Sequence, residues 1–203
     1  VLVSPHRAKR PWQGQLEEGL LPKRPQYDPT CYLCPGNERV GGICNPPYDS
    51  TFAFDNDFAA LLPDAPEPER AAHPLLRRQG VRGTCRVLCF SPRHDLSLAE
   101  MQRDEIVSVV DMWAEQTRDL GQTYRWVQVF ENKGAVMGCS NPHPHGQVWA
   151  QDRLPDEAIR EDAMQIDYLR EHGIPLLEDY IELELREGVR LVVEEDHWIA
   201  TVP

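Results

Sequence analysis

The residues with the clearest chemical potential are His143 and His145, which flank Pro144 in the segment SNPHPHGQVWA (residues 140–150). On a strand, both imidazoles would point to the same side, because side chains alternate with a period of two. Pro144 fixes its own φ and removes a backbone donor. The two rings could share a metal ion, divide the roles of ligand and catalyst, or be solvated residues at the start of a strand. Spacing alone does not choose between these readings.

A second candidate site is the pair Cys31 and Cys34, which is followed by the turn-forming sequence Pro-Gly-Asn. Two thiolates three residues apart on a turn can hold one tetrahedral zinc ion. A thioredoxin-type redox pair would follow a strand and precede a helix, whereas Pro-rich segments flank this pair on both sides. We therefore expect zinc, with two buried cysteines that bind no metal as the alternative. The other ligands would come from the seven histidines, and spacing does not select among them.

Small and polar residues around the two histidines suit a ligand that carries phosphate. Gly138, Ser140 and Gly146 allow a ligand to approach the backbone closely, and Ser140 and Gln147 supply neutral donors. A compact basic cluster near the start of the chain is also suited to phosphate, although taken alone it is better explained as a solvated, charged segment. This cluster consists of Arg7, Lys9 and Arg10. Together these groups indicate transfer of a phosphorus group onto an imidazole, which is covalent nucleophilic catalysis.

Composition excludes several other classes of function. The chain has 203 residues, a formal net charge of −12 and 41% hydrophobic residues. The acidic balance argues against general binding to nucleic acid or to an anionic membrane. No apolar run is long enough for a membrane span, and no secretory signal leads the chain. Six cysteines in a chain of this size do not resemble a secreted disulfide framework, so we expect a cytoplasmic protein.

Three helices and several strands must position these residues. We expect the first helix to begin at Ser97, in a capping box with Glu100, and to end at Gly121. Its apolar stripe would be Ile106, Val109, Val110 and Trp113. The second would run from Pro155 to Gly173, and the third over residues 176–187. The inner face of the second would be Ile159, Ala163, Ile166 and Leu169.

Strand-like runs cover residues 51–54, 86–90, 126–130 and 148–150, and residues 127–130 should pair with the last of these. A hairpin is expected over residues 189–193 and 197–202. Meandering strands with helices between them indicate an α+β fold.

Several segments resemble the galactose-1-phosphate uridylyltransferase family, the transferase branch of the histidine-triad superfamily. They are VFENKGAVMGCSNPHPHGQVWA (129–150), SPHRAKRPWQG (4–14), CYLCPGN (31–37), PPYDSTFAFDNDFAAL (46–61) and YRWVQVF (124–130). The resemblance covers essentially the whole chain and implies one histidine-triad-like nucleotidyltransferase domain over residues 1–203, the N-terminal half of a longer enzyme. The implied fold is α+β: a half-barrel or antiparallel sheet with flanking helices.

The resemblance implies that UMP passes from UDP-glucose to galactose 1-phosphate by a ping-pong reaction. It makes His145 the nucleophile that carries UMP as a phosphoramidate. It makes His143 a zinc ligand, together with Cys31, Cys34 and His94. Gln147 stands where the hydrolase branch has a third histidine. An amide can donate to a phosphoryl oxygen but cannot titrate as an acid or base, so Gln147 favours transfer over hydrolysis.

The resemblance also implies further site residues. The contacts to the nucleotide sugar would be Arg7, Ala8, Lys9, Arg10, Val40, Asn56, Asp57, Asn132, Gly138, Cys139, Ser140 and Gln147. Ser140 would also assist catalysis, and Asn56 with Asp57 would bind uridine, although the same pair could form a cap or turn. Glu161 would bind a second metal, usually iron (Fe²⁺), whose other ligands lie in the second half. By position, however, Glu161 lies off the apolar stripe of its helix, which indicates solvated surface.

The implied partners are UDP-glucose, UDP-galactose and hexose 1-phosphates, with a homodimer at full length and neither nucleic acid nor membrane. Two other functions stay open. One is a different histidine-triad enzyme, such as a phosphorylase of dinucleoside polyphosphates. The other is a zinc-stabilised fragment that binds nucleotides without activity.

Overall fold

A four-stranded antiparallel sheet forms the centre of the molecule. The structure is a computed structural model that describes residues 24–69, 73–76, 78–134, 137–139 and 141–202. The sheet contains β1 (Phe52–Asp55), β2 (Gly83–Cys89), β3 (Trp126–Phe130) and β4 (His145–Gln151), in the order β1-β2-β4-β3. It is an open sheet with β1 and β3 at its edges, so the expected α+β class with an antiparallel sheet is confirmed.

The expected pairing of the third and fourth strands is also confirmed. Val127 lies opposite Ala150 and Val129 lies opposite Val148. Strand β4 is longer than the three residues that we expected, because it begins at His145 and pairs with β2 as well as β3.

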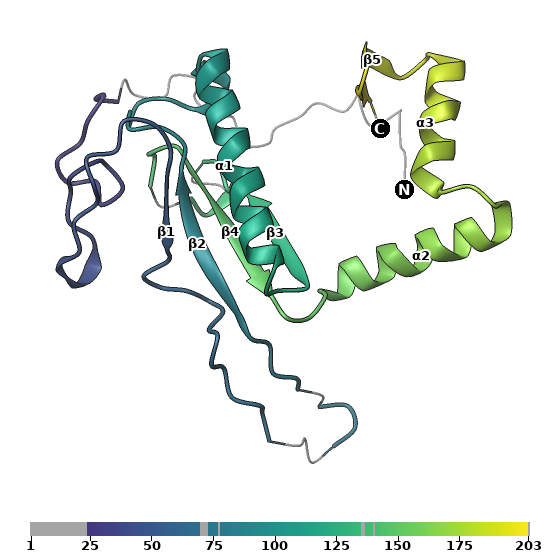
Figure 1. Cartoon of the computed structure of the whole chain (residues 1–203), viewed down its shortest axis with the longest axis horizontal. Coiled ribbons are helices and arrows are strands. Elements are labelled where there is room, and N and C mark those ends of the chain that lie inside the picture. Colours follow the sequence, from purple (N-terminus) through teal and green to yellow (C-terminus); the bar gives the residue numbers. More distant parts are fainter. Residues whose placement is uncertain (1–23, 70–72, 77, 135–136, 140, 203) are drawn as a thin grey trace, which may run out of the picture.

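Helix α1 (Arg103–Gly121) covers one face of the sheet (Figure 1). Alternate side chains of β4 turn toward it, so that Val148 and Ala150 are buried against Val109 and Met112 of the helix. The intervening residues, which include His145 and Gln147, lie on the opposite face and are half-buried. The sheet therefore has one face for the core and one face that carries the candidate site.

The start of the first helix differs from our expectation. Ser97 and Glu100 do form the capping box, but it closes only the short 3-10 helix η3 (Leu98–Glu100). Met101 is extended, and α1 begins at Arg103 with a second box between Gln102 and Glu105. Two of the four residues predicted for the apolar stripe of this helix are confirmed. Val109 is buried and Trp113 packs on the core, whereas the other two predicted members, Ile106 and Val110, are exposed.

Helices α2 (Asp156–His172) and α3 (Leu176–Glu187) lead away from the sheet to the hairpin of β5 (Leu191–Glu195) and β6 (Trp198–Thr201) (Figure 1). The two helices and the hairpin were all expected, but β5 lies two residues later than predicted and β6 is one residue shorter at each end. Pro155 is the N-cap of α2 rather than a residue of its first turn. The predicted inner face of α2 is wrong within this chain. Its members Ile159, Ala163, Ile166 and Leu169 are exposed, and α2 leads away from the sheet (Figure 1). No helix in the described ranges is long and apolar enough to span a membrane.

Candidate functional site

Four buried side chains form a cluster that could hold a metal ion. They are Cys31, Cys34, His94 and His143, and their ligand atoms all lie within 4.8 Å of one another. The cysteines lie on a turn, where the N–H of Cys34 donates to the carbonyl of Cys31. His94 lies between β2 and η3, and His143 lies just before β4. Segments far apart in the sequence therefore meet at one point, as the resemblance implied.

The spacing of the donor atoms fits a tetrahedral ion. The Sγ atom of Cys34 is 3.5 Å from Nδ1 of His143 and 3.7 Å from Nδ1 of His94. Zinc with ordinary bonds to sulfur and nitrogen gives a sulfur–nitrogen edge of about 3.6 Å in a tetrahedron. Two thiols and two imidazoles form a donor set that zinc favours. The four residues thus fit zinc in both chemistry and distance.

Neighbouring polar groups orient these ligands. The Nε2–H of His143 donates to the carbonyl of Ser91 at 2.9 Å, which leaves the Nδ1 lone pair to face the cysteines. The Nδ2 group of Asn141 lies 3.4 Å from Sγ of Cys31, and its Oδ1 accepts the backbone N–H of His143. Such outer contacts fix the ring orientation and steady the thiolate.

Burial favours the neutral forms of Cys34, His94 and His143 when no metal is bound. It raises the pKa of Cys34 to about 11 and lowers the pKa of His143 to about 4. Burial also lowers the pKa of His94. A neutral imidazole is the form that binds a metal, whereas the thiol must first lose its proton. Metal binding at this cluster therefore releases protons from sulfur and not from nitrogen.

His145 is not a member of this cluster. The strand begins at His145, so His143 precedes it and the same-side argument for two residues on one strand does not apply. The Nδ1–H of His145 donates to the backbone carbonyl of His143 at 2.7 Å. Because a carbonyl only accepts, this bond fixes the tautomer and leaves the Nε2 lone pair free. Of the three open readings, a split between ligand and catalyst is the one that this geometry favours.

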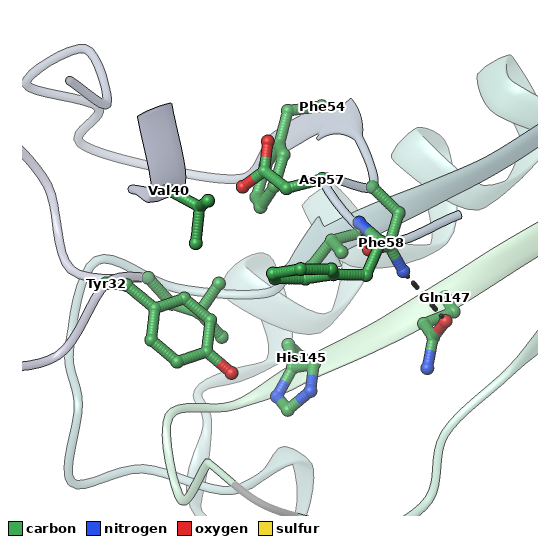
Figure 2. Close-up of a pocket in the computed structure, with 10 residues that line it drawn as sticks. Tyr32, Val40, Phe54, Asp57, Phe58, His145 and Gln147 are labelled. Carbon is green, nitrogen blue, oxygen red and sulfur yellow. Dashed lines mark hydrogen bonds between the residues drawn. The ribbon is translucent and has the colours of Figure 1, made fainter. Parts of the chain in front are cut away.

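A pocket of about 420 Å³ opens beside His145 (Figure 2). It is lined by Tyr32, Leu33, Val40, Phe54, Asn56, Asp57, Phe58, Val87, His145 and Gln147. The resemblance had implied Val40, Asn56 and Asp57 as substrate contacts, and the structure places all three here. The turn reading of Asn56 also holds, because its Oδ1 accepts the N–H of Phe58 at 2.9 Å.

A second, smaller cavity of about 70 Å³ adjoins the same histidine. Its lining is Asn132, Gly138, Cys139, His145, Gly146 and Gln147. Gly146 is required here, because a Cβ atom would lie 2.8 Å from the carbonyl oxygen of Phe130 and 2.8 Å from Cζ of Phe90. The polar lining and small size suit one phosphoryl group. Asn132, Gly138 and Cys139 thus lie together with His145 and Gln147.

Some expected site residues are not brought to the site. Glu161 is exposed on α2, and the one candidate metal group among the described residues does not include it. Because the other ligands of the second metal were expected in the second half, outside this chain, the assignment of Glu161 stays a prediction. Arg7, Ala8, Lys9, Arg10 and Ser140 lie outside the described residues.

Sequence reasoning also missed residues that shape the site. Arg39 contacts Asp57 and lies over the ring of Phe54, and Trp149 contacts Gln147. No sequence signal identifies Arg39, since a lone arginine in a loop is usually solvated. Trp149 lies two residues after Gln147 on β4, and period-two alternation could have placed it on the same face.

Comparison with known proteins agrees with this geometry. The family model "Galactose-1-phosphate uridyl transferase, N-terminal domain" matches residues 1–155. The chain is 56% identical to the galactose-1-phosphate uridylyltransferases of Haemophilus influenzae and Rattus norvegicus, all of it aligning with 58% and 54% of those proteins. A solved structure described as "Structure of uridylyltransferase" superposes with a TM-score of 0.73 at 27% identity, over 100% of this chain and 58% of that one.

The chain thus spans a little more than half the length of the curated relatives that it matches. The matched model covers most of the chain, including both cysteines, His94 and the segment with the two histidines. The chain belongs to the galactose-1-phosphate uridylyltransferase family, and its first 155 residues match the N-terminal domain of that family.

Proposed function

We propose that the chain supplies the nucleotidyl-transferring half of a UDP-glucose–hexose-1-phosphate uridylyltransferase, with His145 as the nucleophile. The hydrogen bond from Nδ1 of His145 to the carbonyl of His143 is the observation that carries this proposal. It holds the imidazole in the tautomer whose Nε2 can attack phosphorus, at a point where the two site cavities meet.

The reaction would proceed in two displacements at the α-phosphorus. In the first, Nε2 of His145 forms a bond to the α-phosphorus of UDP-glucose. The bond from that phosphorus to the bridging oxygen breaks, and glucose 1-phosphate leaves with the electron pair. In the second, a phosphate oxygen of galactose 1-phosphate attacks the phosphoramidate and the P–N bond breaks. The products are UDP-galactose and free His145.

The surrounding residues would bind and orient the reacting groups. Val40, Asn56 and Asp57 would hold uridine in the larger pocket, on one side of the nucleophile. Asn132, Gly138, Cys139 and Gln147 would contact the phosphoryl oxygens in the smaller one. By resemblance, Ser140 and the basic segment Arg7, Ala8, Lys9 and Arg10 would add further phosphate contacts.

The cluster of Cys31, Cys34, His94 and His143 would hold zinc. When bound, the ion would supply a crosslink rather than a reacting group, because four protein ligands fill a tetrahedral site. His143 lies two residues before the nucleophile and accepts its Nδ1–H bond, so a fixed His143 would fix His145 in turn.

We also propose that residues 1–203 form one domain and that the whole protein is a longer, homodimeric enzyme of the cytoplasm. The matched relatives are longer than this chain, which supports a longer whole protein. All six cysteines are free thiols in the structure, which is typical of a reducing compartment.

The test uses UDP-glucose with radioactive uridine, the 203-residue chain, and a version extended to the length of its relatives. We expect one uridylyl group per chain on the peptide that contains His145, labile to acid and discharged by galactose 1-phosphate. His145→Asn should abolish labelling. Labelling of another residue, or exchange that persists in His145→Asn, would refute the mechanism.

Substrate comparison separates the alternatives. Faster turnover of diadenosine tetraphosphate than of UDP-glucose would indicate a dinucleoside-polyphosphate phosphorylase. Binding of UDP without labelling or exchange in either version would indicate a nucleotide-binding module.

A further inference from the structure

We propose that Trp149 is a positioning residue: its indole N–H sets the side-chain amide of Gln147 so that the NH₂ group is presented to the phosphoryl site beside His145. The inference concerns the orientation of one amide, and its catalytic consequence rests on the proposed function. Gln147 and Trp149 lie two residues apart on β4 and on the same open face of the sheet.

The amide oxygen of Gln147 accepts from two donors. Nε1 of Trp149 lies 3.1 Å from Oε1 of Gln147, and Nδ2 of Asn56 lies 3.4 Å from the same atom. An indole nitrogen can only donate, so the group that faces it must be the oxygen. The reverse orientation of the amide would place an NH₂ group against the indole N–H and leave both without an acceptor.

The orientation of Asn56 is fixed independently by the backbone. Its Oδ1 accepts the N–H of Phe58 at 2.9 Å, which turns its NH₂ group toward Gln147. The dashed line of Figure 2 marks this contact, and the amide nitrogen of Gln147 lies on the side away from it. A backbone donor and an indole donor together determine the direction of the Gln147 amide.

The indole is itself held in place. Trp149 lies opposite Cys85 of β2 and Gln128 of β3, so its backbone is fixed on both sides. Its ring meets the ring of Phe130 edge-on, with centroids 5.6 Å apart and an interplanar angle of 78°. The donor is therefore a rigid part of the sheet, whereas Gln147 has three rotatable side-chain bonds that a second group must fix.

The consequence concerns the developing charge at phosphorus. Gln147 lines the small cavity together with His145, and its NH₂ group has no protein partner among the described residues. A donor that is already aimed before substrate binds stabilises the transition state without reorganisation. A rotated amide would instead present its oxygen to a phosphoryl oxygen, and two acceptors repel. Of the two amide orientations, which have nearly the same shape, Trp149 thus selects the one in which Gln147 can donate to a phosphoryl oxygen.

The test compares Trp149→Phe with the matched variant Trp113→Phe in the extended protein. Trp113 is the right control because its buried Nε1 makes no hydrogen bond among the described residues, so the same substitution removes no bond. We expect Trp149→Phe to lower kcat for UMP transfer about three- to tenfold, with KM for UDP-glucose little changed, as for the loss of one hydrogen bond. Trp113→Phe should leave kcat unchanged.

A double-mutant cycle with Gln147→Ala shows whether the effect passes through the amide. In the Gln147→Ala background, Trp149→Phe should cause no further fall in kcat. If the full effect of Trp149→Phe persists there, or if Trp113→Phe lowers kcat equally, the proposal is wrong and Trp149 only packs. Should Trp149→Phe fail to fold, benzothienylalanine at position 149 replaces the N–H with sulfur and keeps the ring shape.

A readout without activity separates this proposal from the proposed function. In ¹⁵N–¹H spectra, the side-chain NH₂ signals of Gln147 should shift and broaden in Trp149→Phe and stay in place in Trp113→Phe. Unchanged Gln147 signals in Trp149→Phe would overturn the inference. If these shifts occur but UDP-glucose never labels His145, the amide is oriented as proposed and it is the uridylyl transfer that fails.

Discussion

The partly buried ion pair between Arg39 and Asp57 yields a quantitative prediction about the wall of the larger pocket beside His145. Nη1 of Arg39 lies 2.9 Å from Oδ1 of Asp57, and the two side chains are only 9% and 19% exposed. The guanidinium carbon also lies 3.9 Å from the ring centroid of Phe54. A hydrogen bond between charged groups in such a setting contributes about 1.5–3 kcal/mol, because little water competes for it.

The chain contains a matched exposed pair. Arg170 and Asp167 lie 3.2 Å apart with side chains 75% and 66% exposed, and exposed pairs of this kind contribute about 0.2–0.5 kcal/mol. We expect a double-mutant cycle of Arg39→Met and Asp57→Asn, followed by urea unfolding, to give a coupling of about 1.5–3 kcal/mol. The contact with Phe54 is lost in both legs that remove Arg39, so it cancels. Equal coupling in the Arg170→Met and Asp167→Asn cycle would refute the reasoning.

Three further predictions concern the glycine at the site, the metal cluster and an ion pair of the C-terminal hairpin. Gly146→Ala should destabilise the chain by about 1–3 kcal/mol in thermal unfolding, because the added Cβ would lie 2.8 Å from neighbouring atoms. The control is Gly121→Ala, whose Cβ would have no atom within 4 Å and which should be neutral or stabilising. Zinc affinity, measured against a chelating dye, should rise at least tenfold per pH unit between about pH 6 and 8. The reason is that Cys34, whose pKa is raised to about 11, must release a proton before it can bind the ion. An affinity that does not change with pH would contradict this. The hydrogen bond from Arg190 lowers the pKa of Glu184, so the stability it provides is fully present above the ordinary carboxyl pKa and is lost as pH falls through the lower folded-state pKa. Stability should therefore fall less between pH 7 and about pH 3 in Arg190→Gln than in the unchanged chain, and equal falls would exclude the effect.

Elements with strong local signals could be predicted from the sequence. The alternation in residues 126–130 predicted the bounds of β3, and the expected third helix over residues 176–187 coincides with α3. The start of α1 could not be predicted in this way. The box of Ser97 with Glu100 is present, but it caps a 3-10 turn as well as it would a helix, and the extended backbone of the buried Met101 separates that turn from α1.

Only part of the candidate site could be predicted from the sequence, because the rest depends on which segments the fold brings together. The CxxC pair indicates a metal by itself, but His94 is one histidine of seven and only the fold brings it to Cys34. The role of Trp149 depends on an amide orientation that a sequence does not contain. Helix α2 shows what periodicity cannot predict. The pattern places apolar residues on one face of the helix, but it does not say whether anything packs against that face, and here the face is exposed.

The bond that orients the imidazole of His145, the proposed nucleophile, ends on a backbone carbonyl. Every residue type has that carbonyl, so replacement of the side chain at position 143 removes a metal ligand without removing the acceptor. The two properties of this segment are therefore separable in evolution. A descendant could lose the four-residue Cys/His cluster one side chain at a time while the imidazole of His145 kept its orientation, provided that other packing kept the strand in place.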